Sequence, residues 1–116
     1  MQTISDDGFV LVVAKPRSEL RHRDAVEEIE AMVRLLKHPS VRHARVLIDL
    51  RECKSASREA RQCFASESPK HVDRIAMLID DGLSRVIANF FVGLTRPRVA
   101  IRIFTVEQLA KDWLKG

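Results

Sequence analysis

The chain of 116 residues is 46% hydrophobic and 31% charged, and its formal net charge is +4. This length and composition are typical of one globular domain with a buried core, and they exclude an extended disordered chain. No apolar run approaches the roughly 20 residues that cross a bilayer, and the start of the chain has no signal-peptide pattern. We therefore expect one domain over residues 1–116, in the cytoplasm and not associated with a membrane.

The small positive excess is only a weak sign of an anionic partner. Proteins that stack nucleic-acid bases place aromatic residues among basic ones, whereas this chain has one Trp and no Tyr. We therefore do not expect nucleic acid as the partner. Cys53 and Cys63 do not have the C-x-x-C spacing, so we expect two free thiols rather than a disulfide.

The N-terminal segment predicts a β-hairpin followed by a helix. Residues 2–5 and 9–14 are short strand-like runs, and Asp-Asp-Gly between them is a recognised turn signal. Asp24 is the expected N-cap of the helix, although the pattern also allows a start at Ser18. Pro39 sets the end of the helix near residue 38. One face of the helix carries the apolar residues Val26, Ile29, Met32, Val33 and Leu36, and the opposite face carries Glu27, Glu28, Glu30 and Arg34.

Residues 44–50 form a continuous apolar run, which is typical of a strand that is buried on both faces of a parallel sheet. A polar connection over 51–57 leads to a helix at about 57–65. The residues of that helix expected to face inward are Ala60, Cys63 and Phe64. Ser-Glu-Ser-Pro at 66–69 predicts a return turn.

A second buried strand is predicted over 75–79, and it ends in Asp-Asp-Gly at 80–82. The next helix is closed by Gly93 ahead of Pro97. Its apolar residues recur at helical steps: Leu83, Val86, Ile87, Phe90, Phe91 and Leu94.

The last strand is predicted over 99–104, and the last helix starts at Thr105, with Gln108 at the spacing of a capping box. The expected buried face of this helix holds Val106, Leu109, Ala110, Trp113 and Leu114. A hairpin followed by alternating helices and strands predicts an α/β fold, with a four- or five-stranded mixed sheet and about four helices.

From about Ala44 to Leu114 the chain resembles the SpoIIAA-like family, which is related to the STAS domain of anti-anti-sigma factors. The resemblance is carried by VLIDL at 46–50, RIAMLIDDGLSRVIANFFVGL at 74–94 and IRIFTVEQLAKDWL at 101–114. It implies a small bacterial α/β sandwich that acts as a regulatory or binding module and often self-associates. It implies neither an enzymatic activity nor a cofactor.

In STAS regulators a partner kinase phosphorylates a serine at the start of the helix after the second buried strand, in a motif close to Asp-Ser-Ser-Gly. The corresponding segment here is Lys-Ser-Ala-Ser-Arg at 54–58, which lacks the acidic residue and the glycine. By this resemblance Ser55 and Ser57 are candidate modification sites. The alternative is that one of them caps the second helix.

Asp49, Asp80 and Asp81 fall at the carboxyl ends of predicted strands, the edge at which open α/β sheets bind ligands. These carboxylates could act as acid and base or hold a metal. Alternatively, Asp81 caps the next helix and Asp80 or Asp49 binds loop backbone. Ser84 and Arg85 open that helix and could hold an anion with its free N–H groups, although the neighbouring aspartates would repel one.

No metal or nucleophile motif is present. The four histidines, His22, His38, His43 and His71, show neither HExxH nor a Cys/His ligand spacing, and there is no GxSxG. We therefore assign no catalytic, metal or cofactor residue. Phe90 and Phe91 are adjacent and would point about 100° apart on a helix, so we expect one of them to contact a partner subunit.

The sequence therefore predicts a non-enzymatic regulatory or protein-binding module that forms a homodimer. It would dock a helix face around the second and third helices onto a protein partner. The alternative is a small-ligand or anion-binding domain that uses the strand-end edge around Asp49, Asp80, Ser84 and Arg85.

Overall fold

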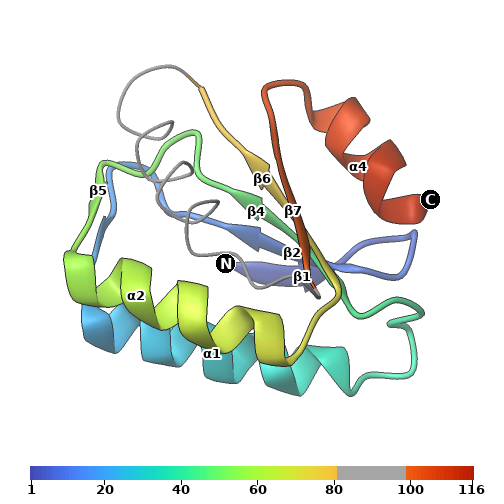
Figure 1. The fold of residues 1–116 in the computed structure, drawn as a ribbon, viewed down its shortest axis with the longest axis horizontal. Coiled ribbons are helices and arrows are strands. Elements are labelled where there is room, and N and C mark those ends of the chain that lie inside the picture. The colour runs from blue at the N-terminus through green and yellow to red at the C-terminus, as the bar shows by residue number, and fades with distance from the viewer. Residues whose placement is uncertain (81–98) are drawn as a thin grey trace.

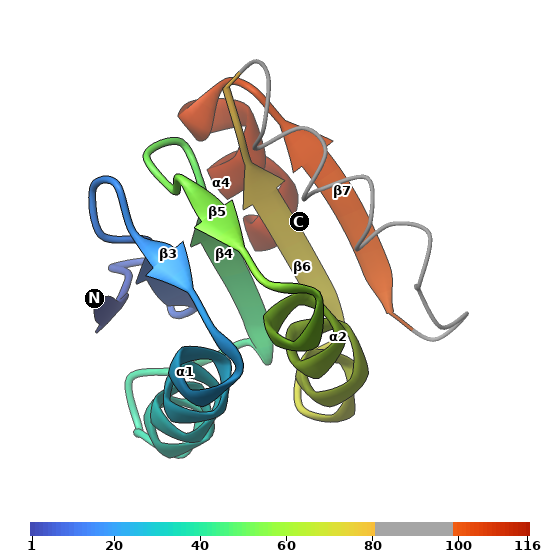
Figure 2. The ribbon, with the colours of Figure 1, turned by 90° about the vertical axis from the view of Figure 1, so that its left-hand side faces the viewer.

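The computed structural model describes residues 1–80 and 99–116, which form a five-stranded sheet with helices on both faces, as Figure 1 and Figure 2 show. In spatial order the strands are β1 (Gln2–Ile4), β2 (Val10–Val13), β4 (Arg45–Asp49), β6 (Arg74–Leu78) and β7 (Ala100–Phe104). β1 is antiparallel to β2, and the other neighbours pair in parallel. The predicted α/β class and mixed sheet are confirmed.

Three α-helices lie in the described residues: α1 (His22–Leu36), α2 (Arg58–Glu67) and α4 (Glu107–Lys115). α1 and α2 run side by side on one face of the sheet, and α4 covers the other (Figure 2). The sequence predicts about four helices, and the one that it places between Gly82 and Gly93 lies outside the described residues. None of the helices in residues 1–80 and 99–116 is long and apolar enough to cross a membrane.

The predicted N-terminal hairpin is confirmed. Gln2 lies opposite Val12 across the β1–β2 pair, and the turn between the strands contains Gly8 with a φ of 86°. The Gly8 carbonyl accepts the backbone N–H groups of Arg42 and His43. This contact ties the turn to the segment that precedes β4.

The sheet divides the core into two layers because each parallel strand is apolar on both faces. The layer under α1 and α2 is built on residues such as Val10, Val46, Ile75 and Met77. The layer under α4 contains Phe9, Leu47, Ala76, Leu78, Ala110 and Leu114. The continuous apolar runs predicted as buried strands therefore occupy the centre of the molecule.

The start of α1 differs from the prediction. Its N-cap is Arg21 rather than Asp24. Asp24 lies one turn inside, at the third helical position, where its Oδ2 accepts the backbone N–H of Arg21 at 2.9 Å. The carboxylate still stabilises the helix start, because it meets free N–H groups and the positive end of the helix dipole.

A second, two-stranded sheet was not predicted. β3 (Glu19–Leu20) and β5 (Ser55–Ala56) pair in parallel, and the connections that contain them, residues 15–20 and 51–57, form what we call the strap. Cys53 is buried at its centre, with its Sγ 3.4 Å from the carbonyl oxygen of Ser55. Burial raises the pKa of the Cys53 thiol. The segment that the sequence predicts as a polar connection is therefore an ordered wall.

α2 begins where the sequence predicts and extends further. The predicted return turn at 66–69 is instead the last turn of the helix followed by a short 3-10 helix, Ser68–Lys70. Pro69 is tolerated there because the first residues of a helix need no hydrogen-bonded N–H.

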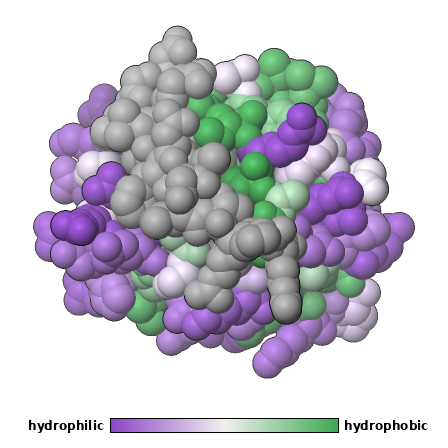
Figure 3. All heavy atoms as spheres, in the orientation of Figure 1, coloured by the Kyte–Doolittle hydropathy of each residue, from purple (hydrophilic) through white to green (hydrophobic). Residues whose placement is uncertain are grey.

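The start and the buried face of α4 also differ from the prediction. Its N-cap is Val106, not Thr105, with no side-chain cap bond, and Gln108 bonds instead to Asp112. Val106 and Leu109 are 50% and 56% exposed, and Figure 3 shows hydrophobic surface over the start of this helix. Val106 has an extended backbone, so helical spacing does not apply to it. Leu109 points about 100° away from buried Ala110, as adjacent helical residues do.

Arginines hold the C-terminal end of α4 against the sheet. Nη1 of Arg45 donates to the carbonyl of Leu114 at 2.6 Å, and Nη1 of Arg74 donates to the carbonyl of Trp113 at 2.9 Å. The guanidinium groups of Arg74 and Arg102 lie over the Trp113 ring, 5.4 and 5.8 Å from its centroid. These contacts satisfy free helix carbonyls and add cation–π attraction.

Replacing Gly8 tests the turn of the hairpin. In Gly8→Ala the new Cβ would lie 3.0 Å from two side-chain carbons of Arg42, at a backbone φ that L-residues rarely adopt. We expect the free energy of unfolding in urea to fall by about 1–3 kcal/mol. Gly116→Ala is the control, because its Cβ would meet only ordinary contacts at 3.7 and 3.8 Å. Equal stability of the two variants would contradict the prediction.

Candidate functional site

The carboxyl ends of β2, β4 and β6 meet at one edge of the sheet. Because each crossover helix returns antiparallel to its strands, α1 and α2 also start at this edge, beneath the strap (Figure 1). We call this region the strand-end face. It is the edge at which the sequence predicts a site.

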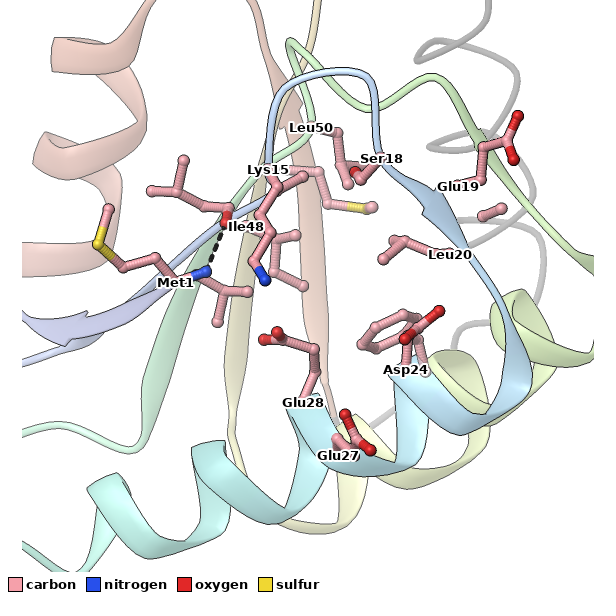
Figure 4. Close-up of a pocket in the computed structure, with 16 residues that line it drawn as sticks. Met1, Lys15, Ser18, Glu19, Leu20, Asp24, Glu27, Glu28, Ile48 and Leu50 are labelled. Atoms are coloured by element: carbon pink, nitrogen blue, oxygen red, sulfur yellow. Dashed lines mark hydrogen bonds between the residues drawn. The ribbon is translucent and has the colours of Figure 1, made fainter.

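A pocket of about 200 Å³ opens on the strand-end face, between the sheet, the strap and the start of α1 (Figure 4). The strands β2, β4 and β6, the strap and α2 all contribute to its wall. Its apolar lining includes Val12, Leu20, Ile48, Leu50, Phe64 and Met77. The pocket is thus formed from the same apolar layer that packs under α1 and α2.

Acidic residues surround this apolar lining on two sides. Asp24, Glu27 and Glu28 line the pocket from α1, and Glu19 lines it from the strap (Figure 4). Lys15 is the one lysine or arginine among the described lining residues. The mouth of the pocket is therefore acidic although the chain as a whole is basic.

The four acidic residues of the pocket differ in their hydrogen bonds and ion pairs. Oε2 of Glu28 accepts Nε2 of Gln2 at 2.7 Å, Asp24 caps α1, and Glu19 pairs with Lys54 at 3.3 Å. Glu27 is exposed and makes no hydrogen bond or ion pair within the described chain. It is the acid most open to a ligand.

Sequence reasoning placed Glu27 and Glu28 on the solvent face of the helix and did not identify the pocket. Both lie on α1 as predicted, but the strap passes beside the helix and converts that face into a rim. The available signal was the acidic run in the first half of this helix within a basic chain.

Asp49 is engaged in a structural contact. Its Oδ1 accepts the backbone N–H and Nε of Arg51, both at 3.0 Å, and its Oδ2 accepts Nη2 at 2.7 Å. Nη2 of Arg51 also donates to Glu107 of α4 at 3.0 Å. The hydrogen bond to Asp49 raises the pKa of the Arg51 guanidinium. Asp49 thus binds loop backbone, which is the alternative that the sequence left open.

The other strand-end candidates are described only in part. Asp80 is exposed two residues beyond the end of β6, the strand that pairs with the strand of Asp49. The other residues predicted for this edge, Asp81, Ser84 and Arg85, and the candidate interface residues, Phe90 and Phe91, lie outside the described residues.

Ser57 caps α2. Its Oγ accepts the backbone N–H of Ala60 at 3.1 Å, and its own N–H donates to the carbonyl of Leu20 in β3. Ser55 lies in β5 and is half-buried. The interpretation of one serine as a helix cap is therefore confirmed for Ser57.

Within residues 1–80 and 99–116, no three His, Cys, Asp or Glu side chains gather as a metal site would need. Both cysteines are free, as predicted. Burial raises the pKa of both thiols, and Glu67 adds to the shift at Cys63. Since the thiolate is the reactive form, neither cysteine has the environment of an activated nucleophile.

Comparison with known proteins identifies the fold. The family model of a domain of unknown function (DUF7793) matches residues 3–116. None of the curated proteins matches the chain.

Two solved structures are similar over nearly their whole length. An uncharacterised protein of the DUF3478 family with a SpoIIAA-like fold, from Shewanella loihica PV-4, superposes with a TM-score of 0.62 at 22% identity, covering 98% of this chain and 90% of that one. The anti-sigma factor antagonist SpoIIAA, in its unphosphorylated form, gives a TM-score of 0.63 at 14% identity, covering 100% and 97%. The chain therefore has a SpoIIAA-like fold, as the resemblance implies.

If Asp49 is structural, Asp49→Asn should lower stability. The asparagine loses the charge that pairs with Arg51. We expect the free energy of unfolding in urea at pH 7 to fall by about 1 kcal/mol, a small loss because Arg51 is partly exposed. Lys54→Gln, which breaks the exposed pair with Glu19, should cost less than about 0.5 kcal/mol. An Asp49→Asn protein as stable as the parent would return Asp49 to the list of ligand-binding candidates.

The two serines should respond differently to alanine. Ser57→Ala removes the cap of α2 and should reduce the free energy of unfolding by about 1 kcal/mol, whereas Ser57→Asp should restore most of it, because Asp is an equally good N-cap. Ser55→Ala is the matched control with no cap to lose. The assignment fails if chemical denaturation gives equal losses for Ser55→Ala and Ser57→Ala.

Proposed function

Because the chain belongs to the family of the domain of unknown function DUF7793 and has a SpoIIAA-like fold, we propose that it is a non-enzymatic regulatory module that binds a protein partner. The partner docks on the strand-end face, at the pocket and the starts of α1 and α2. The single observation that carries this proposal is the open apolar pocket at that face.

The chemistry around the pocket supports binding rather than catalysis. The polar side chains that line it are mainly carboxylates on α1 and the strap, and three of them already hold backbone or side-chain N–H groups. Neither thiol lines the pocket, and burial raises the pKa of both. An apolar pocket with a polar rim is typical of a site that anchors a partner side chain.

The regulatory part of the proposal draws on the structural neighbour described as an anti-sigma factor antagonist. At 14% identity this neighbour supports a role of the same general kind, and it does not identify the partner. The position of Ser57 supports such a role, because this half-buried serine caps α2 beside the strap, next to the exposed Arg58.

We also propose that the chain forms a homodimer, with Phe90 and Phe91 as interface residues. The support is their adjacency in the sequence, because adjacent residues of the helix predicted there would point about 100° apart. The alternative function, a small-ligand or anion site around Asp49, Asp80, Ser84 and Arg85, is less favoured because Asp49 already binds Arg51 in three hydrogen bonds.

Site-specific photo-cross-linking tests the proposed docking face. A benzoylphenylalanine at Arg58, the exposed first residue of α2, should give a discrete cross-linked product in cells that make the protein. The same group at Lys37, exposed beyond the far end of α1, should not. The product is identified by mass spectrometry, and its binding is then measured with purified proteins.

Two results bear on the choice of partner. A product containing two copies of the chain, with a mass by light scattering that stays dimeric on dilution, supports the homodimer. A second protein that binds in purified form supports the regulatory role. Equal cross-linking at Arg58 and Lys37, or none at either, would contradict docking at the strand-end face.

A further inference from the structure

We infer that the pocket accepts one apolar side chain of a peptide segment that carries lysine or arginine on both sides of it. This inference rests on the proposed binding function and adds the chemistry of the partner. It follows from the size of the pocket, the position of its charges and the state of Glu27.

The size of the pocket limits what can enter it. Pockets for drug-sized ligands measure about 300–1,000 Å³, whereas this one measures about 200 Å³. That space holds a single side chain such as Leu, Met or Phe, and it is too small for a nucleotide or a complete lipid tail. Its lining of aliphatic residues with Phe64 and Met77 favours an apolar group.

The acidic residues around the pocket determine which ligand residues are favoured next to the inserted side chain. Acids lie on opposite sides of the pocket, with Glu27 and Glu28 on α1 and Glu19 on the strap (Figure 4). A ligand that places its apolar group inside therefore meets carboxylates on both flanks, although Glu19 already pairs with Lys54. A basic–apolar–basic segment satisfies this arrangement, and complementary charge speeds its association and rejects acidic competitors.

Glu27 and Lys15 should have opposite effects on the binding of a ligand cation. Glu27 has no partner within the described chain and is exposed, so a ligand cation can pair with it without breaking an existing contact. Lys15 reaches across the mouth toward Glu28 in Figure 4. Its ammonium group forms no ion pair within the described chain, but its positive charge at the mouth should repel a ligand cation.

The three methionines provide an internal readout. Met77 lines the pocket, Met1 lies at its mouth, and Met32 is buried in the same layer but does not line it. In protein with ¹³C-labelled methionine methyl groups, acetyl-Lys-Leu-Lys-amide should shift the Met77 and Met1 signals saturably and leave Met32 in place. Acetyl-Lys-Ala-Lys-amide should bind about tenfold more weakly, since it loses the buried side chain.

Charge variants give effects of opposite sign. Glu27→Gln should weaken binding of acetyl-Lys-Leu-Lys-amide about two- to fivefold, the effect of one exposed ion pair, and Lys15→Gln should strengthen it by a similar factor. Glu30→Gln, one turn along α1 and outside the pocket, should leave it unchanged. Raising the salt concentration should weaken binding to the parent more than to Glu27→Gln.

Two outcomes would overturn the inference. In the first, acetyl-Glu-Leu-Glu-amide shifts the Met77 signal to the same extent as acetyl-Lys-Leu-Lys-amide does. In the second, only dioleoylphosphatidylcholine vesicles shift it, so that the pocket accepts lipid. If the cross-link at Arg58 identifies a partner while the basic peptide fails to bind, the proposed function stands and this inference falls. If both experiments fail, both proposals fall.

Discussion

Parallel pairing of β4 with β2 and β6 is the constraint on which the other features depend. Parallel strands need a crossover between them, and each crossover brings the chain back to the same edge of the sheet. The carboxyl ends of three strands, the starts of two helices and both halves of the strap therefore lie together. The pocket exists at that edge because the connections there are long enough to form a wall.

The central strands could be predicted from the sequence because burial on both faces leaves an uninterrupted apolar run, as in residues 46–50. A serine cap of α2 could also be predicted, because serine is favoured at the N-cap, and the structure identifies Ser57 rather than Ser55 as that cap. The family resemblance identified the fold because it includes the two central strands, β4 and β6, most of whose residues are buried. In these cases the determining interaction is local or is repeated along one element.

The features that were missed depend on contacts between distant segments. β3 and β5 have two residues each, which is too short for any periodicity, and they are strands only because they pair with each other. Val106 and Leu109 fit a helical stripe, but the position of the first helical turn determines that they face outward. Likewise, Glu27 and Glu28 become a pocket rim only where the strap passes them.

The strap is held in place by main-chain hydrogen bonds. The shape of the pocket therefore depends little on the side chains that determine which ligands it binds. Backbone groups of Lys54 and Ser55 bond to the carbonyl of Ser18, and that of Ser57 bonds to Leu20. Side chains that project from the strap, such as Glu19, contribute little to keeping it in place. Related chains can therefore exchange these side chains and acquire new binding preferences while the wall itself stays unchanged, which makes this edge suited to evolutionary diversification.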